Sequence, residues 1–380
     1  MTADTVDTSI KGITGVGETG GVAAVTSAVR GRVDELLAGF LDARRPPVGD
    51  PDVAEGYRLL REFVVDGGKR IRPLLCYWGW RGAGGEEPHD DRAADDRAAD
   101  DRAVVTGAAL ELYHAGLLIH DDVMDGSELR RGRPTIHRGL AGTSRWTGAE
   151  AFGRSAAILL GVLAQAWADE LLADAAAGDA RGRAARELFN RMRTEVVTGQ
   201  YLDILAHARA DADVERALTV IRYKTARYTV ERPLQIGAAL AGAPPALLEA
   251  YSRFGLPLGE AFQLRDDVLG VFGDPAVTGK PVLDDLREGK RTVLMAYAYA
   301  RARGPERDLL RTWHGAPDLD ERRAAELRRI IVGTGALGEV EGLIALRAGQ
   351  ALDALRDCAI APEAAQALTM LTERLTRRVR

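Results

Sequence analysis

Three aspartates close together in one apolar stretch, Asp121, Asp122 and Asp125, are the residues of this chain best suited to chemistry. On a helix, positions i and i+4 are neighbours on one face, so Asp121 and Asp125 are expected to project together, with Asp122 close by. Converging carboxylates repel one another unless a cation lies between them, and hard oxygen ligands suit Mg²⁺, which often shares its coordination with substrate phosphates. Arg130 and Arg131 follow and add guanidinium groups that bind phosphate. The cluster therefore predicts a site for a metal-bound diphosphate.

The alternative interpretation of this first cluster is an acidic surface patch at the end of a helix. The stretch from Val104 to Met124 carries a long apolar face, so the cluster lies at the C-terminal end of the predicted helix. Acids at that end oppose the helix macrodipole, which favours cations there. Bound metal accounts for this placement better than a solvated patch does.

A second acidic cluster, Asp266-Asp267, lies on another predicted apolar helix and is followed by Asp274. Glycine stands at Gly270, where an acid at i+4 would complete a cluster like the first. Alone, this pair is a weak signal. Together with the first cluster, it predicts a cage of carboxylates around several metal ions.

Basic residues elsewhere could meet a second diphosphate that carries no metal. The segment from Gly67 to Pro73 reads Gly-Gly-Lys-Arg-Ile-Arg-Pro. Its glycines permit the backbone to approach an anion closely, and the side chains of Lys69 and Arg72 could then bind that anion. The alternative is an ordinary basic turn at a helix end. His114 lies seven residues before the first cluster, nearly on the same face, although a lone helical histidine is usually a core or rim residue. Lys224 is likewise more often a snorkelling surface residue when considered alone.

The acidic repeat within residues 82–103 resembles the aspartate clusters in composition only. Its five-residue period advances about 140° per repeat on a helix, so its acids spread around the axis, and it has no apolar face. We expect a solvated low-complexity insert there, without metal chemistry.

Composition favours one class of fold and excludes several functions. The 380 residues are 46% hydrophobic and only 6% aromatic, with abundant Ala, Leu, Arg, Asp and Glu, which favours helices over strands. The net charge of −5 provides no global basic field, so no nucleic-acid partner is expected. The two cysteines, Cys76 and Cys358, fit no metal or redox spacing. We find no signal peptide and no apolar run long enough for a membrane span, and expect a soluble, cytoplasmic protein.

The order of patterns along the chain predicts a single all-helical domain. Residues 1–24 lack helical periodicity and are expected to form a flexible leader, and residues 25–380 form the domain, with the insert at 82–103. One domain is favoured over two because the two aspartate clusters need each other. The later helices are predicted at 104–124, 147–177, 183–206, 213–230, 232–242, 246–269, 288–303, 306–313, 319–334, 338–357 and 362–378.

Taken together, these residues resemble the trans-isoprenyl diphosphate synthase (polyprenyl synthetase) family, and most closely the actinobacterial geranylgeranyl diphosphate synthases. The resemblance runs from about Val33 to the C-terminus. It rests on many motifs in the right order: Gly67 to Pro73, His120 to Asp125, Arg130-Arg131-Gly132, Lys224-Thr225, Phe262 to Asp267, Gly273-Asp274-Pro275, Thr278-Gly279-Lys280 and Gly289-Lys290-Arg291-Thr292.

The resemblance implies an all-α bundle around a deep central cavity, a homodimer, and three Mg²⁺ ions between two aspartate helices. It implies the condensation of isopentenyl diphosphate with an allylic diphosphate, geranyl or farnesyl, through an allylic carbocation. The implied metal ligands are Asp121, Asp125 and Asp266, with Asp122 and Asp267. Arg130, Lys224, Lys280 and Lys290 would neutralise the allylic diphosphate, while Lys69, Arg72, His114 and Arg131 would hold isopentenyl diphosphate. Thr225 and Gln263 would lie along the cation.

Two departures from the family pattern concern the clusters. The first cluster lacks the two-residue insertion of many bacterial short-chain members, and the second has Gly270 in place of the usual last aspartate. The glycine leaves open how the second cluster holds metal.

Product length is expected to depend on residues just before the first cluster. In this family a bulky aromatic four or five residues before the first aspartate stops chain growth early, and those positions are Leu117 and Gly116 here. Tyr113, one turn deeper, is the predicted floor. This favours a twenty-carbon product, geranylgeranyl diphosphate, with farnesyl or longer-chain products as alternatives. A terpene cyclase and a non-catalytic regulatory subunit are the less favoured functions.

Overall fold

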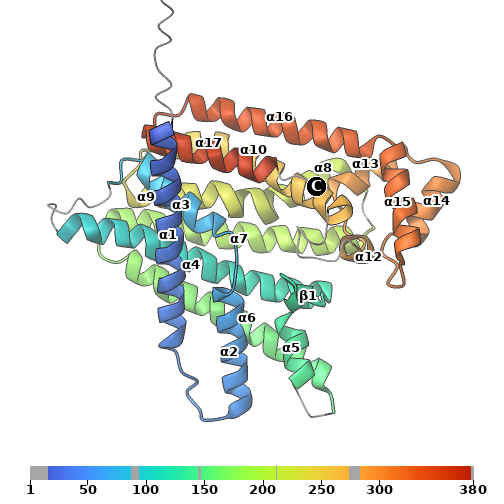
Figure 1. Cartoon of the computed structure of the whole chain (residues 1–380), viewed down its shortest axis with the longest axis horizontal. Coiled ribbons are helices and arrows are strands. Elements are labelled where there is room, and N and C mark those ends of the chain that lie inside the picture. Colours follow the sequence, from blue (N-terminus) through green and yellow to red (C-terminus); the bar gives the residue numbers. More distant parts are fainter. Residues whose placement is uncertain (1–15, 87–93, 144–146, 211, 274–282, 378–380) are drawn as a thin grey trace, which may run out of the picture.

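The computed structural model describes residues 16–86, 94–143, 147–210, 212–273 and 283–377 (Figure 1). Almost all of them belong to helices. The elements are α1 (Val16–Asp42), α2 (Pro51–Val65), α3 (Ile71–Gly82), α4 (Ala94–Asp125), β1 (Leu129–Arg130), β2 (Arg133–Pro134), α5 (Ile136–Thr143), α6 (Ala149–Ala175), α7 (Ala180–Ala208), α8 (Val214–Val220), the π-helix η1 (Ile221–Glu231), α9 (Arg232–Leu240), α10 (Pro245–Phe272), α12 (Asp284–Arg287), α13 (Val293–Arg301), α14 (Gly304–Trp313), α15 (Glu321–Gly333), α16 (Ala336–Arg356) and α17 (Pro362–Thr376).

The long helices form a bundle. In Figure 1, α4, α6, α7, α10 and α16 run in similar directions, α1 crosses them, and α14 and α15 close the end beyond α16. α4 packs along α6, and α10 packs along α16 and η1. The predicted all-α fold is confirmed: the only strands in the described part of the chain are the two short ones of the β1–β2 hairpin.

Aspartates and a threonine at the N-caps explain several helix starts. The side chains of Asp50, Asp179, Asp213 and Asp320 accept hydrogen bonds from backbone N–H groups in the first turns of α2, α7, α8 and α15. Thr292 does the same for α13. These residues satisfy donors that a helix leaves unpaired at its N-terminus. The start of α13 at Val293 thus follows from its cap, later than the predicted start at 288.

Buried side chains form two apolar clusters that meet along α10. The larger one includes Leu110 and Leu112 of α4 and Phe254 of α10. The smaller one joins the C-terminal half of α10, through Val268, to α13, α15 and α16. α10 therefore carries its aspartates on a helix that is fixed at both ends by burial.

Some boundaries differ from those predicted. α1 begins at Val16, within the span predicted as a leader, and Val22 is buried. α4 begins at Ala94, so its helical turns include the second half of the acidic repeat, and Ala103 is buried. The span 213–230 was predicted as one α-helix, but it is α8 followed by η1. η1 packs closely against α7 and α10, and helical periodicity does not report such contacts.

Contrary to the prediction that no apolar run is long enough, two helices could cross a membrane by length and composition alone. They are the Asp101–Asp125 part of α4 and the whole of α6. The apolar window of α4 is 72% buried inside the bundle, whereas that of α6 is 39% buried. The α4 segment is therefore a core helix, and α6 leaves apolar side chains on the surface.

Candidate active site

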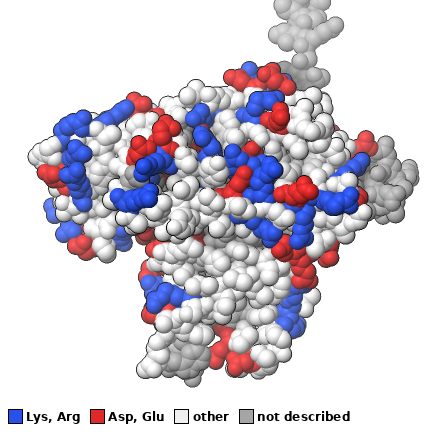
Figure 2. Space-filling model, turned by 180° about the vertical axis from the view of Figure 1, so that it is seen from behind, with Lys and Arg blue, Asp and Glu red and all other residues white. Residues whose placement is uncertain are grey.

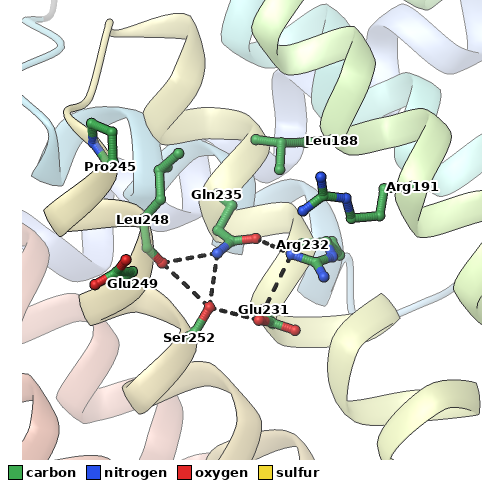
Figure 3. A pocket seen from close by; sticks show the side chains of 9 residues that line it. All are labelled: Leu188, Arg191, Glu231, Arg232, Gln235, Pro245, Leu248, Glu249 and Ser252. Atoms are coloured by element: carbon green, nitrogen blue, oxygen red, sulfur yellow. Dashed lines mark hydrogen bonds and ion pairs between the residues drawn. The ribbon is translucent and has the colours of Figure 1, made fainter.

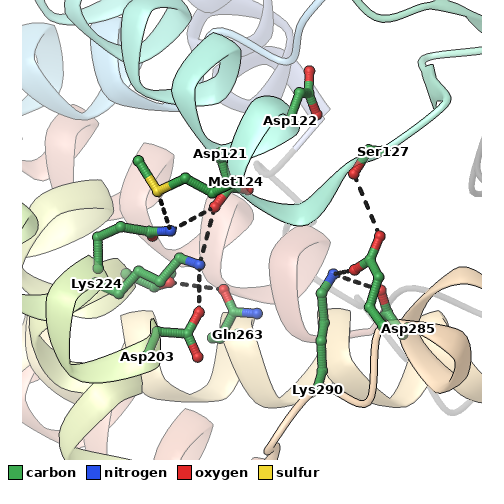
Figure 4. A network of polar contacts seen from close by, with 12 residues as sticks. Asp121, Asp122, Met124, Ser127, Asp203, Lys224, Gln263, Asp285 and Lys290 are labelled. Carbon is green, nitrogen blue, oxygen red and sulfur yellow. Dashed lines mark hydrogen bonds and ion pairs between the residues drawn. The ribbon is translucent and has the colours of Figure 1, made fainter. Parts of the chain in front are cut away.

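The first aspartate cluster lies at the C-terminal end of α4, and its members point in different directions. Figure 4 shows Asp121 directed towards Lys224, while Asp122 points to the other side of the helix, as expected for adjacent helical positions. Asp122 is buried and accepts from Arg130 Nε at 2.9 Å. Arg130 also lies 3.8 Å from Asp121 Oδ2. Arg130 thus contacts both aspartates, and its hydrogen bond to Asp122 fixes the direction of its guanidinium group.

Arg130 and Arg131 are positioned by the β1–β2 hairpin that follows α4. Arg131 and Gly132 have φ of 55° and 76°, and two central residues with positive φ make the tight turn typical of hairpins. Because of this turn, the two arginine side chains contact different parts of the protein. Arg130 contacts the aspartates, whereas Arg131 Nη1 donates to the carbonyl oxygen of Gly67 at 3.0 Å.

Lys224 connects the first cluster to α7. Its Nζ lies 3.2 Å from Asp121 Oδ1 and 2.6 Å from Asp203 Oδ2, and Gln200 Nε2 donates to Asp121 Oδ1 at 3.0 Å. Burial would lower the pKa of Lys224, but the charges of Asp121 and Asp203 raise it above its ordinary value. Lys224 therefore stays protonated beside the cluster and presents a positive charge there.

Sequence reasoning missed Gln200 and Asp203. Their one local signal is a spacing of three residues, which places both on one face of α7. Nothing in the sequence relates that face to Asp121, 79 positions away along the chain.

The second cluster is joined to η1 through a chain of side chains. Thr225 Oγ1 donates to Gln263 Oε1 at 2.8 Å, and Gln263 Nε2 donates to Asp267 Oδ1 at 2.8 Å. Asp267 is buried, whereas Asp266 is exposed. Thr225 and Gln263, both predicted for the site, therefore lie next to each other and next to Asp267.

Lys290 lies at the other side of the site, held by two acids. Its Nζ is 2.6 Å from Asp285 Oδ1 and 3.1 Å from Glu288 Oε2. Glu288 in turn accepts from Ser127, just beyond the first cluster, at 3.3 Å (Figure 4). Burial would lower the pKa of Lys290, but Asp285 and Glu288 hold it well above its ordinary value. Asp274 and Lys280, which were also predicted for the site, lie outside the described residues.

The donor set fits divalent cations. Burial and the neighbouring Asp121 raise the pKa of Asp125 to about 7. Burial, together with the charges of Asp266 and Asp285, raises the pKa of Asp267 to about 8 despite the hydrogen bond from Gln263. Such carboxylates are crowded by like charge, which a cation relieves. In the described part of the chain no group of three acids, histidines or cysteines converges closely enough to hold a metal ion. A Mg²⁺ ion at these aspartates would therefore need further ligands from phosphates and water.

A separate basic site surrounds Arg72 at the start of α3. Arg72 Nη2 donates to Thr229 Oγ1 at 2.7 Å, and its guanidinium lies 4.2 Å from the ring centre of Tyr228. Arg72 Nε is buried and has no hydrogen-bond partner among the described residues. His114 lies 5.9 Å from Tyr228, ring centre to ring centre, and burial, followed by the charge of Arg72, lowers its pKa well below the ordinary value. An unpaired guanidinium N–H beside a neutral histidine suits an incoming anion.

The Gly67–Pro73 turn carries Arg72 to this site, whereas the side chain of Arg70 lies elsewhere. Gly67 and Gly68 have φ of 108° and 117°, which favour glycine and bring the backbone close to Arg131. Arg70, in contrast, is buried and donates to Glu111 Oε1 at 2.9 Å and Asp34 Oδ1 at 2.6 Å. Arg70 is therefore a structural residue that holds the turn.

The residues predicted to limit product length have different surroundings. Tyr113 is buried, and its ring packs edge-on against Phe189 and Tyr228 at centre distances of 5.6 and 6.5 Å. Leu117 is partly buried against the larger apolar cluster. A Cβ added to Gly116 would lie 2.7 Å from the carbonyl oxygen of Gly161, so this glycine faces α6 and allows α4 and α6 to approach closely.

A cavity of about 340 Å³ lies away from these residues, among α7, η1, α9 and α10 (Figure 3). Its polar groups bond to one another: Ser252 Oγ donates to Glu231 Oε1 at 2.6 Å, and Gln235 Nε2 donates to Ser252 Oγ at 2.9 Å. No residue of the predicted site lines it. We assign it a structural role.

The chain is similar throughout to known prenyl diphosphate synthases. The family model described as polyprenyl synthetase matches residues 54–331. Geranylfarnesyl diphosphate synthase of Aeropyrum pernix is 36% identical over 335 residues, 87% of this chain and 96% of that protein. Geranylgeranyl diphosphate synthase of Sulfolobus acidocaldarius is 35% identical over 246 residues, 64% of this chain and 67% of that protein.

Solved structures of prenyl diphosphate synthases are also similar to this chain. Geranylgeranyl pyrophosphate synthase from Corynebacterium glutamicum, complexed with isoprenyl diphosphate and magnesium, superposes with a TM-score of 0.85 at 40% identity, covering 93% of this chain and 98% of that one. The resemblance inferred from the motifs is thereby confirmed, and so is the helical-bundle fold. The chain belongs to the polyprenyl synthetase family of prenyltransferases.

Proposed function

We propose that the chain catalyses the Mg²⁺-dependent, head-to-tail condensation of isopentenyl diphosphate with an allylic diphosphate, geranyl or farnesyl, giving geranylgeranyl diphosphate. One observation carries the proposal: η1 borders both the first aspartate cluster and the basic site around Arg72. Lys224 contacts the first aspartate cluster, and Thr229 contacts Arg72 in the basic site. Two such sites suit an enzyme that joins two diphosphates.

The allylic diphosphate is placed between the two clusters. Asp121, Asp125, Asp266 and Asp267 would hold Mg²⁺, with Asp122 acting through Arg130, and three ions per site follow from the family resemblance. The bound metal would neutralise the leaving diphosphate. Lys224, Arg130 and Lys290 add fixed positive charge there, and Lys280 is proposed to do the same.

The carbon–oxygen bond of the allylic substrate then breaks, and its electron pair leaves with the diphosphate. Thr225 and Gln263 would present oxygen dipoles along the resulting allylic cation, and the hydrogen bonds that they make to each other and to Asp267 fix their positions. The double bond of isopentenyl diphosphate, held by Lys69, Arg72, His114 and Arg131, attacks the cation. Loss of a proton restores a double bond in a product five carbons longer.

We propose that the product has twenty carbons and that Tyr113 limits its length. Tyr113 lies one turn below Leu117 and packs against α7 and η1, which supports it as the pocket floor. Relatives with different product names, including farnesyl diphosphate synthase of Mycobacterium tuberculosis at 35% identity over 234 residues, leave farnesyl and longer products as the alternatives.

We propose a homodimer formed through α6 and α7. Both helices carry large apolar side chains on the surface: Ile158, Leu159, Val162, Val197, Tyr201 and Ile204. Apolar surface of this kind is typical of an obligate interface. On the face shown in Figure 2, basic and acidic residues are interspersed, so this face presents no uniformly basic surface to a nucleic acid. We also propose that the protein is cytoplasmic.

One experiment tests the activity. Purified protein is incubated with Mg²⁺, isopentenyl diphosphate and, separately, dimethylallyl, geranyl or farnesyl diphosphate, and products are separated by chromatography. An elongated diphosphate of twenty carbons is expected. A cyclic hydrocarbon would identify a terpene cyclase, and no turnover would identify a regulatory subunit.

A further inference from the structure

Lys290 lies in a turn between α12 and α13, residues 288–292, called the Lys290 turn below. Neighbouring residues fix the chain on both sides of Lys290. Leu286 of α12 is fully buried, and Thr292 Oγ1 caps α13 by accepting from a backbone N–H of its first turn at 3.2 Å. Gly289 has a φ of 68°, a left-handed conformation that favours glycine. The direction of the Lys290 side chain therefore depends on how this turn is held.

The connection between α14 and α15, residues 314–320, packs directly against the Lys290 turn. The backbone N–H of Gly315 donates to the carbonyl oxygen of Leu286 at 2.8 Å. A Cβ built on Gly289 would lie 2.8 Å from Gly315 Cα, so the two backbones touch without room for a side chain. The turn thus rests on the end of the bundle that α14 and α15 close (Figure 1).

Arg287 joins the same two segments through its side chain. Its Nε and Nη2 both donate to the carbonyl oxygen of Leu319, at 3.0 and 2.8 Å, and Leu319 is fully buried. An ionised donor makes strong hydrogen bonds, and two of them from one rigid guanidinium fix both its distance and its orientation. The Arg287 side chain is therefore directed to the α14–α15 connection and holds the turn from there.

We propose that Arg287 is a positioning residue for Lys290. It clamps the start of the Lys290 turn to the α14–α15 connection, and the clamped turn presents the ammonium group of Lys290 to the diphosphate. Arg287 acts through Lys290 and touches no substrate itself. This inference rests on the proposed function, in which Lys290 neutralises the allylic diphosphate.

The competing explanation is that Arg287 only stabilises the packing of α12 on the α14–α15 connection. The two explanations differ in whether the effect of losing Arg287 passes through Lys290. Losses that act independently multiply in a double variant, whereas losses that act through one group do not. A double-mutant cycle between Arg287 and Lys290 therefore separates them.

The test uses four variants of the full chain: Arg287→Ala, Arg287→Lys, Lys290→Met, and the double variant Arg287→Ala/Lys290→Met. Arg102→Ala is the matched control, because Arg102 Nε likewise donates to a backbone carbonyl oxygen, that of Ala175, at 2.8 Å, in the N-terminal part of α4. Steady-state kinetics are measured with varied allylic diphosphate and with varied isopentenyl diphosphate. Isothermal titration calorimetry gives the affinity for inorganic pyrophosphate in the presence of Mg²⁺, and thermal unfolding shows that each variant is folded.

Arg287→Ala is expected to lower kcat/KM for the allylic diphosphate about tenfold, because a displaced turn misplaces the Lys290 charge. The KM for isopentenyl diphosphate is expected to stay unchanged. Arg287→Lys is expected to recover part of the loss, since an ammonium group can also donate to the Leu319 carbonyl oxygen. The double variant is expected to be no worse than Lys290→Met alone, and Arg102→Ala is expected to keep wild-type kinetics.

A double variant whose loss equals the product of the two single losses would overturn the inference, and so would wild-type kcat/KM in a folded Arg287→Ala protein. If Arg287→Ala does not fold, Arg287→Lys takes its place in the cycle under the same criterion. Failure of the proposed function is distinguishable. Wild-type protein that makes no elongated product but shows the same non-additive pattern in pyrophosphate affinity disproves the activity alone. Active wild-type protein with multiplying losses disproves the role of Arg287 alone.

Discussion

Lys224 and Thr229 lie five residues apart on η1, yet each contacts a different charged site. Lys224 Nζ lies 3.2 Å from Asp121 Oδ1, and Thr229 Oγ1 accepts from Arg72 Nη2 at 2.7 Å. Five residues of an α-helix would separate the two side chains by about 140°. The hydrogen bonds of a π-helix span five residues, so its wider turn brings them closer to one face. The π-helical winding of η1 thus brings the side chains of Lys224 and Thr229 towards the same face of the helix.

Replacing Lys224 by methionine is expected to lower kcat by about 100-fold or more, because one fixed charge at the leaving group is lost. Steady-state kinetics with varied allylic diphosphate measure the effect. The KM for isopentenyl diphosphate is expected to change little. A folded Lys224→Met protein with wild-type kcat would contradict the assigned role.

Gly199→Ala is expected to lower both activity and the thermal midpoint. A Cβ at this position would lie 2.3 Å from the backbone nitrogen of Lys224, so η1 must shift. Gly349→Ala on α16 is the matched control, since its Cβ would meet nothing within 4 Å. Helical glycine to alanine normally stabilises by about 1 kcal/mol, which is the change expected for the control. Equal behaviour of the two variants in kinetics and thermal unfolding would rule out a close contact at Gly199.

The free energy of unfolding without metal is expected to fall as pH rises from about 4 to about 7. Burial and the Asp121 charge raise the pKa of Asp125 to about 7, above the ordinary value of 3.8. Between these values the folded protein binds more protons than the unfolded chain, so stability decreases with pH. Denaturant titrations at pH 5 and 7.5 measure the slope.

Asp125→Asn, which cannot ionise, is the control for that slope and is expected to flatten it. The variant is also expected to be more stable than wild type at pH 7.5 without metal, and nearly inactive. A slope unchanged by the substitution would assign the pH dependence to other groups.

Tyr113→Ala is expected to lengthen the product beyond twenty carbons, because it removes the ring that packs against Phe189 and Tyr228. Loss of a buried aromatic ring also costs about 3 kcal/mol of stability. Tyr251→Ala, at another fully buried tyrosine, is expected to lose stability without a change in product length. Chromatography of the dephosphorylated products measures the outcome, and an unchanged distribution for Tyr113→Ala would place the floor elsewhere.

Leu159→Asp is expected to convert the proposed dimer to a monomer. Leu159 of α6 is 68% exposed in the single chain, and a charge there would be buried without a partner at the interface. Leu346→Asp on α16, where the leucine is 55% exposed, is the matched control. Light scattering coupled to size-exclusion chromatography gives the mass. A monomeric wild type, or a dimeric Leu159→Asp protein, would count against this interface.

The sequence by itself determined the helices, the two aspartate clusters and the family. Helical periodicity is local, so the stretches around α4 and α10 were predicted with their aspartates at the correct ends. The charged motifs were also recognisable, because residue type and short spacing carry the chemistry of metal and phosphate binding. Asp121, Lys224 and Arg72 could therefore be named before their surroundings were known.

Only the tertiary structure decided which residues meet. Gln200 and Asp203 join Asp121 and Lys224 because α7 packs beside η1, and Asp285 fills the space beside Gly270 because α12 lies against α10. The π-helical winding of η1 was likewise not predicted from the sequence. Glycines of the neighbouring helices, such as Gly199 and Gly259, lie close to the backbone of η1, and helical periodicity does not report this contact. The physical reason is the same in each case. Periodicity records which face of a helix is apolar, whereas a contact depends on the neighbour that covers that face and on how closely the two backbones approach.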